Sequence, residues 1–186
     1  MIKKHIISLA GDLASGKGAT SVALMNKLKY GVYRNGEYFR KLAREANMDV
    51  TTFNTYVKDH PEIDRQIEKS ASEYAKTHDN FIIDARLGWY AVPESFKVYL
   101  KVDIKEAARR AFNDQNRKET ENFATIEEQE QDIRLRFKIE NERYFELYGV
   151  RKEDLNNYDF VIDTTNITPD EVADRIIEEY NKWLNN

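Results

Sequence analysis

The segment Gly11–Lys17 has the residue types and the spacing of a phosphate-binding loop. It reads G-x-x-x-x-G-K; the apolar segment Lys4–Leu9 precedes it, and apolar residues at helical spacing follow over Lys17–Leu28. Glycine allows a turn tight enough to aim backbone N–H groups at phosphate oxygens, and a helix N-terminus adds partial positive charge. We therefore expect Lys17 to contact the β- and γ-phosphates of a nucleotide. The simpler alternative is a glycine-rich turn followed by a surface lysine.

A carboxylate outside this loop is expected to help bind Mg²⁺. Gly18 follows Lys17, at the position where a serine or threonine commonly supplies a magnesium ligand. Asp84 is the candidate because it ends the apolar run Phe81–Ile83, and ligands bind at the carboxyl ends of strands in open α/β sheets. Arg86 follows at the same edge. The alternatives are an Asp84 that caps the next turn and an Arg86 in a surface ion pair.

The elements that must position these residues are predicted to form an α/β fold of three layers. Short apolar runs bounded by turn residues predict four strands: Lys4–Leu9, Phe81–Asp84, Phe96–Val102 and Tyr158–Asp163. Helical segments alternate with them, which indicates a mostly parallel sheet of about five strands covered on both faces. The polar, helical segment 35–77 is too long for a simple crossover and is interpreted as an insert that carries part of a site. No linker interrupts the chain, so we expect one domain over residues 1–186.

Composition excludes several classes of protein. The chain has 29 basic and 33 acidic residues and a net charge of −4, so a general nucleic-acid surface is not expected. The absence of cysteine excludes a disulfide scaffold, a thiolate zinc site and a cysteine nucleophile. No apolar run approaches the ~20 residues of a membrane helix, and no signal peptide is expected. We expect a cytoplasmic protein that is a monomer and binds no membrane.

Two further arginines lie on a predicted helix from about 126 to 147. Ile133, Phe137 and Tyr144 share one face of this helix at a period of 3.6 residues. Arg136 and Arg143 are seven residues apart and lie together on one border of that face. Their charged ends are therefore expected to reach into a cleft while their stems pack against the core.

Four segments resemble the nucleoside monophosphate kinases, and among them the short, archaeal-type cytidylate kinases. The loop Gly11–Gly18 is similar to their G-x-x-x-x-G-K-G loop, and Asn35–Arg40 to their T-G-D-x-x-R segment. Ile83–Arg86 resembles their D-G-R segment, and Asp159–Thr165 resembles their last strand with its I-D-T-[ST] turn. The resemblance covers nearly the whole chain. It implies a P-loop NTPase fold with a helical acceptor-binding insert and a short lid at about 113–125.

The resemblance also implies site residues. ATP would bind to a loop made of Gly11, Asp12, Leu13, Ala14, Ser15, Gly16, Lys17, Gly18 and Ala19. Arg110 would lie against the triphosphate nucleotide, with Arg109 as the near-equal candidate, and Arg117 would lie in the lid. Arg40 and Arg86 would bind the acceptor phosphate, and Arg136 and Arg143 would close over the transferring phosphate as further catalytic residues.

The implied reaction transfers the γ-phosphate of ATP to CMP or dCMP, with Mg²⁺ held by Asp84. No general base is needed, because the acceptor phosphate is already an anion. Candidates for reading the acceptor base are Asn54, Tyr56, Asp59, Asp64, Trp89 and Tyr90. The sequence departs from the family pattern at Ala19, Asn35, Glu37 and Ala85. Two alternatives therefore stay open: a P-loop kinase for another monophosphate or a non-nucleotide acceptor, and a regulatory ATP-binding protein.

Overall fold

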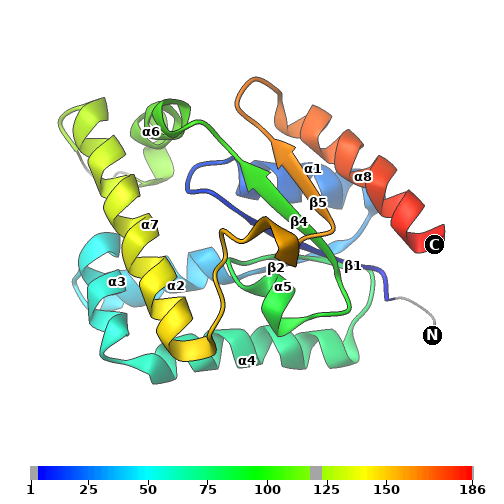
Figure 1. The fold of residues 1–186 in the computed structure, drawn as a ribbon, viewed down its shortest axis with the longest axis horizontal. Helices are drawn as coiled ribbons and strands as arrows, with labels where there is room; N and C mark the ends of the chain where they lie inside the picture. Colours follow the sequence, from blue (N-terminus) through cyan, green and yellow to red (C-terminus); the bar gives the residue numbers. More distant parts are fainter. Residues whose placement is uncertain (1–3, 118–122, 186) are drawn as a thin grey trace.

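A five-stranded parallel sheet forms the centre of the protein (Figure 1). The computed structural model describes residues 4–117 and 123–185. Within these ranges the strands lie in the order β2-β3-β1-β4-β5, and every pair of neighbours is parallel. They are β1 (Ile6–Gly11), β2 (Gly31–Arg34), β3 (Phe81–Asp84), β4 (Phe96–Lys101) and β5 (Phe160–Asp163). The predicted α/β class and parallel sheet are confirmed.

Helices cover both faces of this sheet. One face packs against α1 (Lys17–Leu28) and α8 (Pro169–Asn185). The other face carries α4 (Pro61–Thr77), α5 (Gly88–Ala91) and the C-terminal part of α7 (Ile126–Tyr148). The N-terminal part of α7 packs against α6 (Ile104–Asn113). The result is the three-layer arrangement expected from alternating strands and helices.

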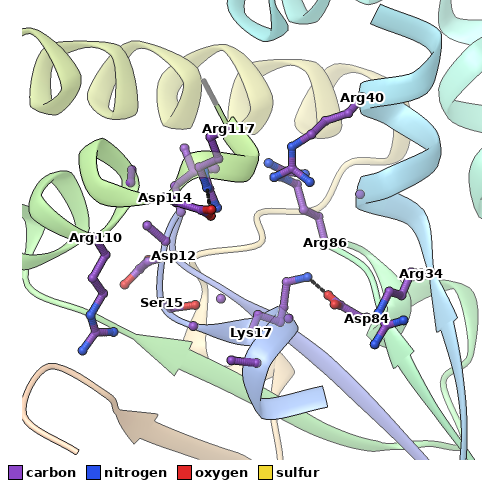
Figure 2. A pocket seen from close by; sticks show the side chains of 18 of the residues that line it. Asp12, Ser15, Lys17, Arg34, Arg40, Asp84, Arg86, Arg110, Asp114 and Arg117 are labelled. Atoms are coloured by element: carbon purple, nitrogen blue, oxygen red, sulfur yellow. Dashed lines mark hydrogen bonds and ion pairs between the residues drawn. The ribbon is translucent and has the colours of Figure 1, made fainter. Parts of the chain in front are cut away.

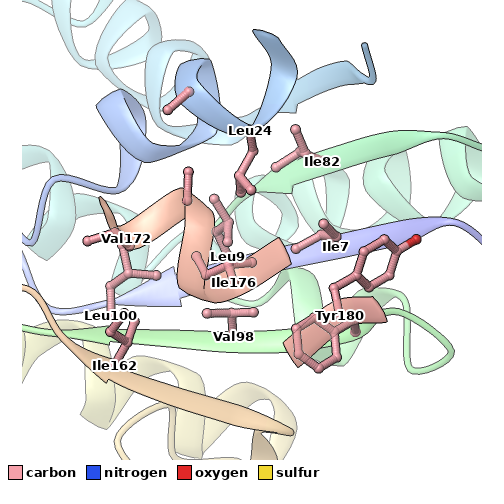
Figure 3. Packing of buried hydrophobic residues seen from close by; sticks show 13 residues of the cluster. Ile7, Leu9, Leu24, Ile82, Val98, Leu100, Ile162, Val172, Ile176 and Tyr180 are labelled. Carbon is pink, nitrogen blue, oxygen red and sulfur yellow. The ribbon is translucent and has the colours of Figure 1, made fainter. Parts of the chain in front are cut away.

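The core follows the two-residue period of the strands. Alternate strand residues point to α1 and α8, where they meet apolar side chains of those helices (Figure 3). The labelled members of this cluster are Ile7, Leu9, Leu24, Ile82, Val98, Leu100, Ile162, Val172, Ile176 and Tyr180. The intervening strand residues, such as Ile6, Phe81 and Ile83, pack toward the opposite layer. Burial on both faces explains why these strands read as continuous apolar runs.

The strand prediction missed β2. This strand has only four residues, lies at the edge of the sheet, begins with an exposed glycine and ends with Arg34. Such a segment lacks the continuous apolar run of a central strand, because only its inner edge is paired. The bounds of β1 also differ, since it begins at Ile6 and extends to Gly11, into the phosphate-binding sequence. β4 ends at Lys101 and β5 begins at Phe160.

Three helices connect β2 to β3. They are α2 (Asn35–Glu45), α3 (Val50–Lys58) and α4, and they share a small apolar cluster with Phe39, Phe53 and Ile67. This segment therefore packs around its own core beside the sheet. The predicted lid at about 113–125 falls partly outside the described residues, which stop at Arg117 and resume at Phe123. Within the described ranges, no helix is long and apolar enough to cross a membrane.

Candidate active site

A cavity of about 590 Å³ opens at the carboxyl ends of β1, β2 and β3 (Figure 2). It brings together residues from the phosphate-binding sequence, from α2, from the end of β3 and from α6. Its lining residues are Gly11, Asp12, Leu13, Ala14, Ser15, Gly16, Lys17, Gly18, Ala19, Val22, Arg34, Gly36, Arg40, Asp84, Arg86, Arg110, Ala111, Asp114 and Arg117. The whole predicted ATP loop therefore lines one cavity with Arg40, Asp84 and Arg86.

The loop follows β1 and packs closely on β4. A Cβ atom at Gly11 would lie 2.5 Å from the carbonyl oxygen of Leu100, so only glycine fits at this crossing. Gly16 precedes α1 with a φ of 85°, a left-handed conformation that glycine adopts without a Cβ penalty. The two glycines of the motif thus satisfy two different requirements. They place the N-terminus of α1 at the cavity wall.

Asp12 fixes this loop to the sheet. Its carboxylate accepts a hydrogen bond of 2.6 Å from the Tyr99 hydroxyl and one of 3.0 Å from the backbone N–H of Val102. Burial, together with the negative charge of Asp12, raises the pKa of Tyr99, so the hydroxyl remains a donor. The side chain of Asp12 therefore anchors the loop, while its backbone lines the cavity with the other loop residues.

Lys17 lies at the centre of the cavity and donates to the carboxylate of Asp84 (Figure 2). The two residues come from the start of α1 and the end of β3. Burial, followed by the nearby positive charges of Arg86, Arg40 and Arg117, lowers the pKa of Lys17 to about 7. A phosphate group placed here would favour the charged ammonium.

The cavity carries an excess of positive charge. Six described lining side chains are cationic, namely Lys17, Arg34, Arg40, Arg86, Arg110 and Arg117, whereas three are acidic, namely Asp12, Asp84 and Asp114. Asp114 is itself paired with Arg117, at 3.1 Å between Oδ2 and Nε. An enclosed cluster of guanidinium groups and loop N–H donors suits a ligand with several phosphates.

Arg110 links this cavity to a smaller one. Its Nη2 atom donates to the carbonyl oxygens of Thr164 and Thr165 at 2.7 and 3.0 Å, and its Nε pairs with Glu106 at 2.8 Å. The second cavity, of about 240 Å³, shares Ser15, Gly16 and Arg110 with the first. Its other lining residues are Thr20, Glu106, Arg109, Thr164, Ile167, Pro169 and Val172. The two together offer space for a nucleotide whose phosphates lie on the loop.

Arg40 and Arg86 lie side by side across the cavity from Arg110 (Figure 2). Arg40 comes from α2 and Arg86 from the turn after β3, so two elements far apart in sequence converge here. Arg34 ends β2 in register with Asp84 and lines the same side. Arg34 was not among the predicted site residues, because the short strand that carries it was not recognised. The two consecutive residues before it, Val32 and Tyr33, both favour strands and were the available signal.

Arg136 and Arg143 do not line either of these cavities. The Nε atom of Arg143 lies 2.8 Å from Asp64 Oδ2, and its Nη1 donates to the backbone and side-chain oxygens of Asn54 at 2.9 and 3.0 Å. The Nη1 atom of Arg136 lies 3.6 Å from Oδ2 of Asp132, and the side chain of Arg136 is 1% exposed. Both arginines are thus buried in the interior and do not reach from the helix border into the cleft.

The residues present fit a single Mg²⁺ held largely by phosphates. Within the described residues no group of three or more acidic, histidine or cysteine side chains converges on one point. Asp84 supplies one carboxylate beside Lys17, and Mg²⁺ in kinase sites commonly uses one or two carboxylates, substrate phosphates and water. Ser15 belongs to the loop, and its hydroxyl is buried without a hydrogen-bond partner, so it offers a further polar contact to a bound phosphate. Ser21 donates its hydroxyl to the carbonyl oxygen of Gly18.

Both the sequence and the fold of this chain are similar to those of known proteins. The sequence model of the cytidylate kinase-like family matches residues 6–166. The cytidylate kinase of Thermoplasma volcanium is 33% identical over 172 residues, which span 90% of this chain and 86% of that protein. An S-adenosylmethionine-dependent nucleotide dehydratase of Lacinutrix mariniflava is 32% identical over 180 residues, which span 96% of this chain and 36% of that protein.

A solved structure with a similar fold is the shikimate kinase of Acinetobacter baumannii in complex with shikimate. Its TM-score is 0.59 at 16% sequence identity, and the superposition covers 97% of this chain and 95% of that one. At this identity the likeness concerns the fold. The cavity at the carboxyl ends of the strands is therefore set in an architecture that other kinases also use.

Proposed function

The chain belongs to the cytidylate kinase-like family, and from this premise we propose that it transfers the γ-phosphate of ATP to CMP or dCMP. As a member of that family it is an ATP-dependent phosphotransferase of the nucleoside monophosphate kinase class. The preference for a cytidine nucleotide is supported by the name of its relative in Thermoplasma volcanium. The nucleotide dehydratase gives no such support, since the chain spans only 36% of that protein.

The observation that supports the proposal is the single cavity in which the glycine-rich loop and two arginines face each other. The loop Gly11–Ala19 with Lys17 forms one wall, and Arg40 and Arg86 lie on another (Figure 2). If a donor triphosphate binds to the loop and an acceptor monophosphate binds to the arginines, the γ-phosphate of the donor faces the phosphate of the acceptor. Positioning of this kind and neutralisation of charge are the main requirements of phosphoryl transfer.

The proposed mechanism gives a defined task to Lys17, Arg110, Arg40 and Arg86. Lys17 contacts the β- and γ-phosphates of ATP, and Arg110 holds the nucleotide where the two cavities meet. Arg40 and Arg86 grip the acceptor phosphate with paired N–H donors and keep it in line with the γ-phosphate. A phosphate oxygen of the acceptor attacks directly, so no side chain has to remove a proton. Arg117 is the last residue of the first described range, and it lines the cavity.

Mg²⁺ would be held at Asp84. When bound there, the ion would neutralise charge on the phosphates of ATP. Because Lys17 is paired with Asp84, we expect a triphosphate in the cavity to compete for the ammonium group and release the carboxylate. Residues 35–77 would bind the acceptor and residues of about 113–125 would close over it, within one kinase domain. We further propose that the protein acts as a cytoplasmic monomer.

The experiment that tests this function is an ADP-production assay with ATP and Mg²⁺. CMP, dCMP, UMP, AMP and GMP are offered separately, with shikimate as a non-nucleotide acceptor and a blank without acceptor. We expect turnover with CMP and dCMP to exceed turnover with the other acceptors by at least about tenfold. Faster turnover with another nucleotide would contradict the proposed specificity and leave the kinase class in place. ADP production that no monophosphate stimulates would overturn the proposed function.

A further inference from the structure

Glu140 is a buried carboxylate that contacts the acceptor side of the cavity from behind. It lies on α7, and its side chain is 1% exposed. Its Oε2 atom lies 2.7 Å from Arg86 Nε and 2.7 Å from Lys152 Nζ. Burial alone would raise the pKa of Glu140, but Arg86, Lys152 and Arg136 hold it well below its usual range. The carboxylate is therefore ionised, and Glu140 itself does not line the cavity.

The contact with Glu140 holds the side chain of Arg86 in one orientation, which its position in the cavity requires. Arginine has many rotamers, and a charged group confined near Lys17 and Arg40 is repelled by both. The Glu140 contact uses Nε of Arg86, the atom nearest the aliphatic stem, and so limits the rotation of the whole guanidinium plane. It also places a negative charge behind the cluster of cations. Arg86 remains at the cavity wall, beside Arg40 (Figure 2).

Lys152 fixes the carboxylate in turn. Its side chain is 1% exposed, lies 5.1 Å from the Phe137 ring centroid and donates to Glu140. A buried carboxylate with two cations leaves this cluster with one net positive charge. Apolar side chains of similar size would fill the same space at a lower desolvation cost. The cluster is thus better explained by the geometry it imposes on Arg86 than by the stability it adds.

We propose that Glu140, held by Lys152, is the positioning residue that orients Arg86 toward the phosphate of the acceptor. The proposal rests on the proposed function, in which Arg86 binds that phosphate. Glu140 acts through Arg86 and makes no contact with either substrate. Its effect should accordingly appear in the affinity for the acceptor and not in the affinity for ATP.

The test compares Glu140→Gln with the wild-type protein and with Glu142→Gln. Glu142 lies on the same helix, is more exposed and pairs loosely with Lys138 at 3.9 Å, so it controls for loss of a charge from α7. We expect Glu140→Gln to raise the KM for CMP by about 10- to 100-fold and to change the KM for ATP less than about twofold. The double variant Glu140→Gln, Arg86→Lys should have nearly the same KM for CMP as Arg86→Lys alone, because both changes remove the same interaction between Arg86 and Glu140.

A second readout needs no turnover. The Nε–H signal of Arg86 in a ¹H–¹⁵N spectrum, identified by its loss in Arg86→Lys, should be protected from exchange in the wild type and in Glu142→Gln. It should lose that protection in Glu140→Gln. If the wild type phosphorylates no monophosphate, the proposed function fails, and this signal still decides whether Glu140 fixes Arg86.

Two results would overturn the proposal. One is a KM for CMP in Glu140→Gln that matches that of Glu142→Gln. The other is an unchanged Arg86 signal together with equal losses in affinity for both substrates, which would indicate a general structural role. If Glu140→Gln does not fold, the double variant Glu140→Gln, Lys152→Met takes its place. It removes one negative and one positive buried charge, and the same selective loss of affinity for CMP is expected.

Discussion

The Nε atom of Arg143 lies 2.8 Å from Oδ2 of Asp64, and this ion pair joins α7 to α4 in the interior of the protein. The side chains are 1% and 5% exposed, and Asn54 of α3 accepts two further hydrogen bonds from Arg143. One arginine therefore connects three helices. The helix that follows the predicted lid is thereby fastened to the helical segment between β2 and β3.

Removing the carboxylate of this pair should destabilise the protein. We expect Asp64→Asn to lower the free energy of unfolding by about 3–5 kcal/mol, because it leaves a buried guanidinium without its compensating charge. Replacing both partners, as Asp64→Leu with Arg143→Met, should recover much of that loss. Urea unfolding measures each value, with Asp170→Asn on the exposed surface as the control. A loss below about 0.5 kcal/mol for Asp64→Asn would show that the pair is not a structural link.

Lys17→Ala should abolish most of the activity and leave the fold intact. The variant removes the cation expected to contact the β- and γ-phosphates, so we expect turnover to fall by at least about 100-fold. The free energy of unfolding is measured alongside turnover, because the change leaves the buried carboxylate of Asp84 without its ion-pair partner and should lower stability without unfolding the protein. Lys27→Ala is the matched control, since Lys27 lies on the same helix and pairs at the surface with Asp174. Near-normal turnover of Lys17→Ala would refute the role given to this residue.

ATP binding should take up a proton above neutral pH. The pKa of Lys17 is lowered to about 7 by burial and by neighbouring arginines, so at pH 8 most molecules carry a neutral amine. Phosphate oxygens favour the ammonium form, and binding should therefore draw in about one proton per ATP at pH 8 and almost none at pH 6. Calorimetry in two buffers of different ionisation enthalpy measures this number. The uptake should disappear in Lys17→Met.

Arg110 and its neighbour Arg109 provide a matched pair for the donor site. Arg110 lines both cavities and is hydrogen-bonded to the carbonyl oxygens of Thr164 and Thr165, whereas Arg109 is 58% exposed. We expect Arg110→Ala to raise the KM for ATP by about tenfold or more, with a smaller effect for Arg109→Ala. Equal effects of the two changes would contradict the assignment of Arg110 to the nucleotide. The KM for CMP should change little in both.

Glu68 should make stability fall as pH rises from about 4.5 to 8. Burial, followed by the nearby charge of Asp64, raises the pKa of Glu68 from 4.5 to about 8, so the folded protein binds a proton that the unfolded chain releases. Its stabilising contribution is thus complete below pH 4.5 and is lost as pH rises through 8. The melting temperature of Glu68→Gln minus that of the wild type should therefore increase as pH rises to 8 and stay constant at higher pH. The exposed Glu73 on the same helix supplies the control, as Glu73→Gln.

The phosphate-binding loop and the strand that ends at Asp84 could both be predicted from the amino-acid sequence alone. Both are local patterns, in which a few consecutive residues specify the backbone: glycines at a tight turn, and apolar residues in a strand buried on both faces. The parallel sheet followed from the alternation of such strands with helices. The edge strand that carries Arg34 was missed, because its four residues are exposed or only partly buried and leave a weak apolar pattern.

The partners of the buried charged residues depend on how the helices pack in the folded protein. Sequence periodicity places Arg136 and Arg143 on the border of an apolar face, but contacts from α3 and α4 bury Arg143. Arg136 is buried as well, and it lies beside Asp132 of its own helix. The partners of Glu140 could not be predicted either, because in the sequence Glu140 is one of many acidic residues on a charged helix. A buried charged side chain needs an opposite charge close to it, and for Arg143 and Glu140 that charge, on Asp64 and Arg86, comes from another segment of the chain. Sequence spacing along one helix carries no information about such partners.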